Sequence, residues 1–159
     1  MSIALREEVR PADVLAVRRI TESSGFFFAE EIDTAVELVE ERLARGTNSG
    51  YWFLFADEDG RTVGYTSFGP IACTKASFDL YWIAVDATWR GKGLGTRLMA
   101  ESERRIAAMG GRRIYVETSS REQYDPTRGF YLARGYREEA RLADFYGPGD
   151  AKVIYVKAL

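Results

Sequence analysis

The stretch DLYWIAVDATWRGKGLGTRLM, from Asp79 to Met99, changes character halfway along. It begins as an apolar run, places Gly91, Gly93 and Gly95 two residues apart, and continues with the pattern of a helix. Glycines let a turn bring N–H groups close to a ligand, and the first turn of a helix offers N–H groups that lack intrahelical partners. The stretch therefore predicts a strand, an anion-binding turn suited to a pyrophosphate, and a helix.

Two other glycine-rich loops fit this stretch poorly. The P-loop of nucleotide hydrolases needs a longer spacing that ends in Gly-Lys-Ser/Thr, whereas Lys92 lies inside the cluster. The dinucleotide pattern G-x-G-x-x-G is not matched, and its domain normally carries that pattern after the first strand. An ordinary strand-to-helix turn without a ligand stays open as the alternative.

Apolar periodicity and turn residues predict the other elements. Upstream, we expect a strand near 3–9, a helix from 11 to 20, an amphipathic helix within 26–46, and a hairpin that turns at 58–60. Downstream, we expect a helix from 94 to about 109, a strand at 113–118, a short helix capped by Asp125, and closing strands at 136–143 and 151–158. A strand, helix and strand joined this tightly predict a right-handed parallel crossover.

Composition excludes several function classes. The chain has 159 residues, a net charge of -2 and no histidine, which removes Ser-His-Asp and Cys-His sites and nearly every zinc site. We therefore expect no metal and no nucleic-acid partner, and Cys73, the single cysteine, is expected to be a packing residue. The sequence shows no signal peptide and no apolar run of about 20 residues, which predicts a cytoplasmic protein without a membrane partner.

Two motifs resemble those of the GNAT superfamily of N-acetyltransferases. VDATWRGKGLGTRLM is similar to the family's acyl-CoA pyrophosphate loop, Arg/Gln-x-x-Gly-x-Gly/Ala, with Arg90, Gly93 and Gly95 at the patterned positions. Downstream, GFYLARGYRE resembles the family's next signature through Tyr131 and Gly135, together with the neighbouring aromatic residues. The order of elements matches over essentially the whole chain, so the resemblance implies a single GNAT domain over 1–159.

The resemblance implies an α+β fold in three α/β/α layers. Its mixed, bent and mostly antiparallel sheet has seven strands, is splayed between strands four and five to admit pantetheine, and is flanked by about four helices. Acetyl-CoA is the implied co-substrate. The implied cofactor-binding residues are Ile83, Ala84, Val85, Arg90, Gly91, Lys92, Gly93, Leu94, Gly95 and Thr96.

The implied chemistry is acetyl transfer from a thioester to an amine. A protonated alkylamine cannot attack, so a base must take its proton, an N–H must stabilise the oxyanion, and the thiolate benefits from an acid. The resemblance suggests Tyr131 as the acid and the backbone of Val85 for the oxyanion. Glu117 is the favoured base and Asp79 its rival, while a core role for Tyr131 and a plain strand-end role for Glu117 stay open.

One segment departs from the family pattern. Many relatives carry Ser-Asn shortly after the fifth strand, and the asparagine reaches the cofactor. Here the segment reads SSREQYDPTRGFY, with Tyr124 near the asparagine position. Ser119, Ser120 or Tyr124 could replace that contact, or the contact could be absent.

The acceptor is less defined. The resemblance places it near TESSGFFFAEE and ADFYGPGDAKV, with Phe28, Asp79, Tyr146 and Asp150 as candidate contacts. The acids of the first segment, Glu30 and Glu31, are better explained as favouring a helix N-terminus. The expected partner is the amine of a small molecule or a peptide N-terminus. A non-catalytic acyl-CoA-binding module is the alternative function, and the oligomeric state, with a homodimer as one option, is left open.

Overall fold

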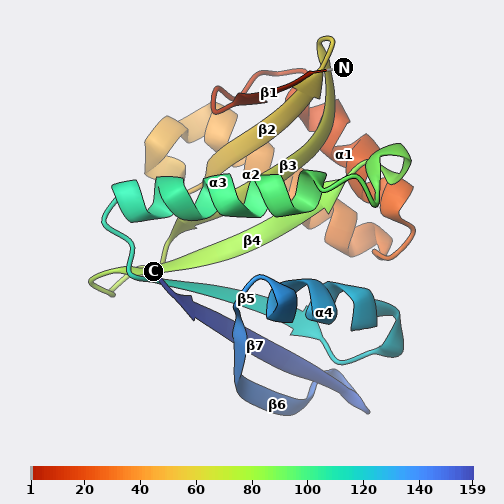
Figure 1. The fold of residues 1–159 in the computed structure, drawn as a ribbon, viewed down its shortest axis with the longest axis vertical. Coiled ribbons are helices and arrows are strands. Elements are labelled where there is room, and N and C mark those ends of the chain that lie inside the picture. The colour runs from red at the N-terminus through yellow and green to blue at the C-terminus, as the bar shows by residue number, and fades with distance from the viewer. Residues whose placement is uncertain (1) are drawn as a thin grey trace. The chain divides into compact units, whose positions relative to one another are not determined.

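The computed structural model describes residues 2–159, which form four α-helices and one seven-stranded sheet (Figure 1). The helices are α1 (Asp13–Ser24), α2 (Ala29–Arg45), α3 (Leu94–Ala108) and α4 (Asp125–Ala133). The strands are β1 (Ile3–Arg6), β2 (Trp52–Glu58), β3 (Arg61–Pro70), β4 (Ser77–Val85), β5 (Arg113–Ser119), β6 (Arg137–Gly147) and β7 (Asp150–Ala158).

The sheet has the order β1-β2-β3-β4-β5-β7-β6. Strand pairs β1–β2, β2–β3, β5–β7 and β6–β7 are antiparallel, whereas β4 and β5 are parallel. The parallel register joins Ser77–Asp79 to Arg113–Tyr115. The predicted mixed, mostly antiparallel fold with a crossover through α3 is confirmed.

The chain forms two compact units. The first unit comprises Met1–Gly69 and Leu80–Arg105, and the second comprises Pro70–Asp79 and Ile106–Leu159. Each unit is described by itself. The assignment of 1–159 to a single domain stays a prediction.

Helices cover both faces of the strands in the first unit. Figure 1 shows α3 crossing one face of β2 and β3, with α1 and α2 on the other. The core between these strands and α1 and α2 is built on the parallel rings of Phe53 and Phe55, whose centroids lie 5.5 Å apart. On the α3 face, the hydroxyls of Thr66 and Ser102 lie 2.6 Å apart and join β3 to the helix.

Helix α2 begins and ends where its sequence predicts. At its N-terminus, the side chain of Glu31 accepts a hydrogen bond of 3.0 Å from the backbone N–H of Phe28, as in the side-chain half of a capping box. At its C-terminus, the chain leaves the helix at Gly46, which has a positive φ of 59°. The prediction that Glu31 favours the N-terminus of this helix is therefore confirmed.

The second unit is an antiparallel arrangement of β5, β7 and β6 with α4 packed on one face. Two predictions for this unit are wrong. Cys73 is exposed in the β3–β4 connection and has a left-handed φ of 65°, because the connection turns there instead of packing its side chain. Asp125 is the first residue of α4, not its N-cap, and its carboxylate pairs with Arg128.

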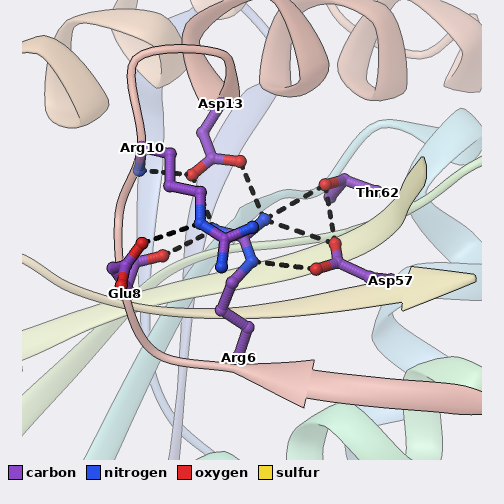
Figure 2. Close-up of polar contacts among 6 residues, drawn as sticks. All are labelled: Arg6, Glu8, Arg10, Asp13, Asp57 and Thr62. Atoms are coloured by element: carbon purple, nitrogen blue, oxygen red, sulfur yellow. Dashed lines mark hydrogen bonds and ion pairs between the residues drawn. The ribbon is translucent and has the colours of Figure 1, made fainter. Parts of the chain in front are cut away.

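A polar network ties β1 to α1 and to the β2–β3 hairpin (Figure 2). The guanidinium of Arg6 donates to both carboxylate oxygens of Asp13 at 2.9 Å and to those of Asp57 at 2.8 and 3.3 Å. It also donates to the hydroxyl of Thr62 at 3.2 Å, and that hydroxyl in turn donates to Asp57. One cation thus satisfies two carboxylates of different elements.

The network has a pH dependence through Asp57. Burial alone would raise the pKa of this carboxyl, but the hydrogen bonds from Arg6 and Thr62 outweigh burial and lower the pKa. A carboxyl whose pKa is lowered by folding stabilises the folded state above its unfolded pKa. This stabilisation is lost as the pH falls through the folded pKa.

Replacing Arg6→Met should lower the free energy of unfolding by about 3 kcal/mol at pH 7, because it leaves two largely buried carboxylates without their cation. Urea denaturation measures the loss. The matched control is Arg10→Met, since Arg10 pairs with Glu8 on the surface and should give no measurable loss. Equal losses in both variants would show that the network does not stabilise the unit.

Among residues 2–159, no helix is long and apolar enough to cross a membrane.

Candidate active site

The first unit carries the glycine turn predicted to bind an anion. After β4, the side chain of Asp86 accepts hydrogen bonds from the backbone N–H of Thr88 at 3.0 Å and from its hydroxyl at 2.8 Å. Burial alone would raise the pKa of Asp86, but these bonds outweigh it and hold the pKa below its usual value. An ionised, hydrogen-bonded Asp86 thus fixes the direction of the chain as it enters the glycines.

The turn needs glycine for its backbone conformation. Gly91 and Gly93 have φ values of 74° and 80°, which other residues rarely adopt. A Cβ atom at either position would meet no atom within 4 Å, so space inside the protein is not the constraint. Gly95 differs because it already lies in α3, whose helical bonding begins with Arg97 N–H to Gly93 O at 3.1 Å.

The first turn of α3 follows these two glycines directly. The N–H groups of Leu94 and Gly95 come before the first helical donor, Arg97, so the helix provides them with no carbonyl four residues earlier. The helix dipole adds partial positive charge at the same end. This arrangement is chemically suited to a phosphate or pyrophosphate.

The two basic side chains of the glycine turn contact other residues of the protein. Arg90 donates to the backbone carbonyl of Ser24 at 2.9 Å, and its guanidinium lies 5.2 Å from the centre of the Phe26 ring. The Nζ of Lys92 lies 4.9 Å from the ring of Trp89. Arg90 therefore joins the turn to the end of α1.

The other predicted residues of the first unit lie near these elements. Ile83, Ala84 and Val85 form the end of β4, and Ala84 is buried in the core under α1 and α2. Phe28 is exposed at the start of α2, next to Phe27, whose ring packs edge-on against Trp82 at 5.0 Å.

The second unit carries the candidate acid. Tyr131 lies on α4 and is buried, with its ring 5.9 Å from that of Tyr136 and 6.0 Å from that of Tyr155. Burial, followed by the nearby Tyr155, raises the pKa of Tyr131 above its usual value. The phenol therefore stays protonated at neutral pH.

The strand register places the candidate acid and base on opposite faces of β5 and β7. Tyr155 pairs with Val116, and Glu117 pairs with Ile154. Because consecutive residues of a strand point to opposite faces, Tyr155 and its neighbour Tyr131 lie on the face away from Glu117.

Two carboxylates and one lysine gather on the Glu117 face. The Nζ of Lys152 lies 2.9 Å from Oε2 of Glu117. Asp79 pairs with Tyr115, two residues before Glu117, so its side chain lies on the same face. Burial, with a further contribution from the charge of Glu117, raises the pKa of Asp79 to about 6, while Lys152 opposes the rise.

Asp150 and Tyr146, two candidate acceptor contacts, lie at the β6–β7 end of this unit. The carboxylate of Asp150 accepts a hydrogen bond from Ser119 and pairs with Arg121 at 3.2 Å. Tyr146 is half exposed and packs edge-on against Phe145, with 5.0 Å between ring centroids. The charge of Asp150 is thus compensated within the protein.

The segment that departs from the family pattern is tied to β7. The hydroxyl of Ser120 accepts from the N–H of Ala151 at 2.8 Å, and Tyr124 is buried with the Arg121 guanidinium 5.4 Å from its ring. The two serine hydroxyls therefore take part in the connection between β5 and β7.

Lys152 and Arg121 are site residues that sequence reasoning missed. Lys152 pairs with Glu117, and Arg121 pairs with Asp150. The sequence alone predicted no cationic partner for either carboxylate. The alternation along AKVIYVKA could have indicated that Lys152 lies on one face of a strand. It could not indicate that this face also carries Glu117, because that depends on the register of β7 on β5.

Comparison with known proteins supports this architecture. A profile described as "Acetyltransferase (GNAT) family" matches residues 15–136. No curated protein sequence matches the chain. A Desulfovibrio desulfuricans protein assigned to the GNAT family is 46% identical, with a TM-score of 0.97 and 99% of each chain covered.

Two more distant structures share the fold. The PaiA N-acetyltransferase from Thermoplasma acidophilum, in complex with coenzyme A, is 20% identical, with a TM-score of 0.74 and 100% of each chain covered. The ribosomal-protein-alanine N-acetyltransferase from Brucella melitensis is 21% identical, with a TM-score of 0.78 and coverage of 98% of this chain and 99% of that one.

The profile match covers most of the chain, and the 46% identical structure extends over nearly all of it. The predicted acyltransferase is confirmed over the non-catalytic alternative. The chain belongs to the GNAT family of acetyltransferases.

Proposed function

We propose that this acetyltransferase moves an acetyl group from acetyl-CoA to a primary amine of a small molecule or of a peptide or protein N-terminus. The observation that carries the proposal is the left-handed turn at Gly91 and Gly93, which leads directly into the N-terminus of α3. Such a turn suits the pyrophosphate of coenzyme A. The coenzyme A complex of the Thermoplasma relative adds support from a shared fold.

The cofactor would be held mainly by backbone groups. We assign the pyrophosphate to the N–H groups from Gly91 to Thr96, and the pantetheine arm to the backbone of Ile83, Ala84 and Val85 at the end of β4. The side chain of Arg90 would act indirectly, because its bond to Ser24 fixes the turn.

The reaction needs three protein groups. A carboxylate, Glu117 or Asp79, takes a proton from the ammonium through water, because both carboxylates lie on the face away from Tyr131, and the freed amine attacks the thioester carbon. The N–H of Val85 stabilises the oxyanion, and the hydroxyl of Tyr131 gives a proton to the departing sulfur. Because burial raises the pKa of Tyr131, a tyrosinate would be short-lived and would regain a proton that the nitrogen releases through solvent.

The ion pairs of the candidate acceptor site bear on the kind of amine that it would accept. On the Glu117 face, Glu117 is paired with Lys152, and Asp150 is paired with Arg121. A site whose carboxylates are largely compensated favours an acceptor with a single ammonium group, such as a peptide N-terminus, over a polycation. The exposed rings of Phe145 and Tyr146 would supply apolar contact.

Acetyl-CoA should raise the melting temperature, whereas ATP and NADH should raise it much less. At one hundred times Kd, the ligand adds about 2.7 kcal/mol to the free energy of unfolding. Gly93→Ala should abolish this shift, because alanine resists the left-handed conformation that the phosphate site needs.

Gly60→Ala is the matched control for this experiment. Gly60 has a φ of 82° and open space around it, so alanine should destabilise the protein comparably. The control should keep the full acetyl-CoA shift. Equal stabilisation by ATP, or a full shift in Gly93→Ala, would refute the assignment of the turn to coenzyme A.

Tyr131→Phe should leave acetyl-CoA binding intact and reduce kcat by roughly 10²–10⁴, the usual range for a positioned proton donor. Tyr136→Phe removes a hydroxyl from the neighbouring ring and should change kcat less than tenfold. Single-turnover kinetics isolates the chemical step. If that step keeps its full rate in Tyr131→Phe, the thiolate leaves without this acid.

A screen of amines by CoA release should favour acceptors with one ammonium group. We expect alanine-initiated peptides to give a higher kcat/KM than aminoglycosides, because the carboxylates Glu117 and Asp150 are already paired with cations of the protein. The reverse order would show that the acceptor site includes acidic groups beyond these residues.

A further inference from the structure

Arg128 joins helix α4 to the end of β5. Its Nη1 donates to the backbone carbonyl of Ser119 at 2.5 Å and to that of Arg121 at 3.0 Å. Its Nη2 forms an ion pair with Asp125, the first residue of the helix. The Arg128 side chain is only 14% exposed, whereas that of Asp125 is 64% exposed. The guanidinium is therefore held at the two carbonyls, and its carboxylate partner lies at the surface.

One of these carbonyls belongs to the paired part of the sheet. Ser119 is the last residue of β5, is buried, and pairs with Lys152 of β7. Its hydroxyl donates a hydrogen bond to the carboxylate of Asp150, which also lies on β7. Because its strand pair fixes Ser119, the bond from Arg128 sets the position of α4 relative to β5 and β7.

The other carbonyl lies in the segment that departs from the family pattern. After β5 the chain forms a short 3₁₀-helix, Glu122–Tyr124, directly before α4. The carbonyl of Arg121 accepts from Arg128 and also from the N–H of Tyr124 at 3.0 Å, as its two lone pairs allow. Arg128 thus bonds to this segment from within the protein, where the resemblance implied an asparagine that contacts the cofactor.

Arg128 and Tyr131 lie three residues apart on α4 and are therefore neighbours on its surface. The ring of Tyr131 packs 6.0 Å from that of Tyr155. Burial, followed by Glu138, raises the pKa of Tyr155. The charge of Arg128 opposes this rise, which places the guanidinium within electrostatic reach of the Tyr155 phenol. The contacts of Arg128 and those of the candidate acid thus meet in one small region.

Helix α4 depends on such contacts for its position. It has nine residues, and isolated helices shorter than about 12–15 residues are marginal in water. Tyr131 gives it apolar contacts, which have no preferred direction, whereas the hydrogen bonds of Arg128 require a particular distance and angle. Arg128 therefore restricts where the helix lies more closely than apolar packing does.

We propose that Arg128 is a positioning residue for Tyr131, which clamps α4 to the end of β5 and so fixes where the candidate acid stands. This inference rests on the proposed function, because it concerns the acid of the same acetyl transfer. Arg128 is assigned no contact with acetyl-CoA or with the acceptor. It acts only through the helix that carries Tyr131.

Amide hydrogen exchange of the ligand-free protein tests the clamp. The N–H groups of Arg134 and Tyr136 bond to carbonyls of α4 and report on its opening. Arg128→Met should speed their exchange by about tenfold or more and leave the amides of α3 unchanged. Arg128→Lys should give a smaller increase, because an ammonium group does not reproduce the planar fork of a guanidinium. Unchanged exchange in Arg128→Met would overturn the clamp.

Two variants separate the carbonyl bonds from the effect of charge. Asp125→Asn removes the ion pair and keeps both carbonyl bonds. Arg137→Met removes a cation of the same unit that pairs with Glu139 at the surface. Both should exchange within about twofold of the wild type, since exposed ion pairs contribute little. If Asp125→Asn matches Arg128→Met, the ion pair holds the helix and the role of the carbonyl bonds is wrong.

Single-turnover kinetics with an alanine-initiated peptide tests the link to Tyr131. Arg128→Met should slow the chemical step by roughly 10–100-fold, because a displacement of about 1 Å can cost that much, and should leave the Kd of acetyl-CoA unchanged. In the Tyr131→Phe background, the same substitution should cost less than about threefold, because the acid that it positions is already absent. A merely structural role would cost the same factor in both backgrounds.

The outcomes distinguish this inference from the proposed function. Equal losses in the two backgrounds would overturn the positioning role of Arg128. If Tyr131→Phe alone keeps the full rate, the proposed acid is wrong and the positioning role falls with it. If acetyl-CoA binds but the peptide is not acetylated, the proposed acceptor is wrong, while hydrogen exchange still decides whether Arg128 holds α4.

Discussion

The register of β5 against β7 is the constraint on which the chemistry of the second unit depends. It pairs Val116 with Tyr155 and Glu117 with Ile154, and so assigns every side chain of both strands to one of two faces. One face is apolar and receives Tyr131 of α4. The other carries the ionisable groups around Glu117. A shift by one residue would exchange these faces, which the buried apolar residues prevent.

Backbone conformation has the same importance in the first unit. The two basic side chains of the glycine turn are engaged with the protein, since Arg90 bonds to Ser24 and Lys92 lies on Trp89. In the proposed coenzyme A site, the attraction for an anion would therefore come mainly from N–H groups and the helix dipole. The two left-handed glycines would then matter more than the basic side chains of Arg90 and Lys92.

Much of the fold could be predicted from the sequence, because its signals are local. The period of α2, the turn before β3 and the glycines before α3 each depend on a few neighbouring residues. Cys73 was predicted wrongly because its backbone conformation depends on how the β3–β4 connection turns. The ion pair of Lys152 with Glu117 could not be predicted, since it depends on the register of β7 on β5, which no local pattern encodes. The pair of Arg121 with Asp150 depends on where the segment after β5 meets the start of β7, which is equally non-local.

Burial acts on both candidate proton-transfer groups, with different consequences for their chemistry. It raises the pKa of Tyr131, which keeps the phenol protonated but makes it a weaker acid. It also raises the pKa of Asp79, which makes that carboxylate a better acceptor for the proton of an ammonium. Desolvation disfavours the charged form of each group. A single physical effect thus strengthens a candidate base and weakens a candidate acid on opposite faces of the same unit, and the charges of Glu117 and Lys152 adjust only the base.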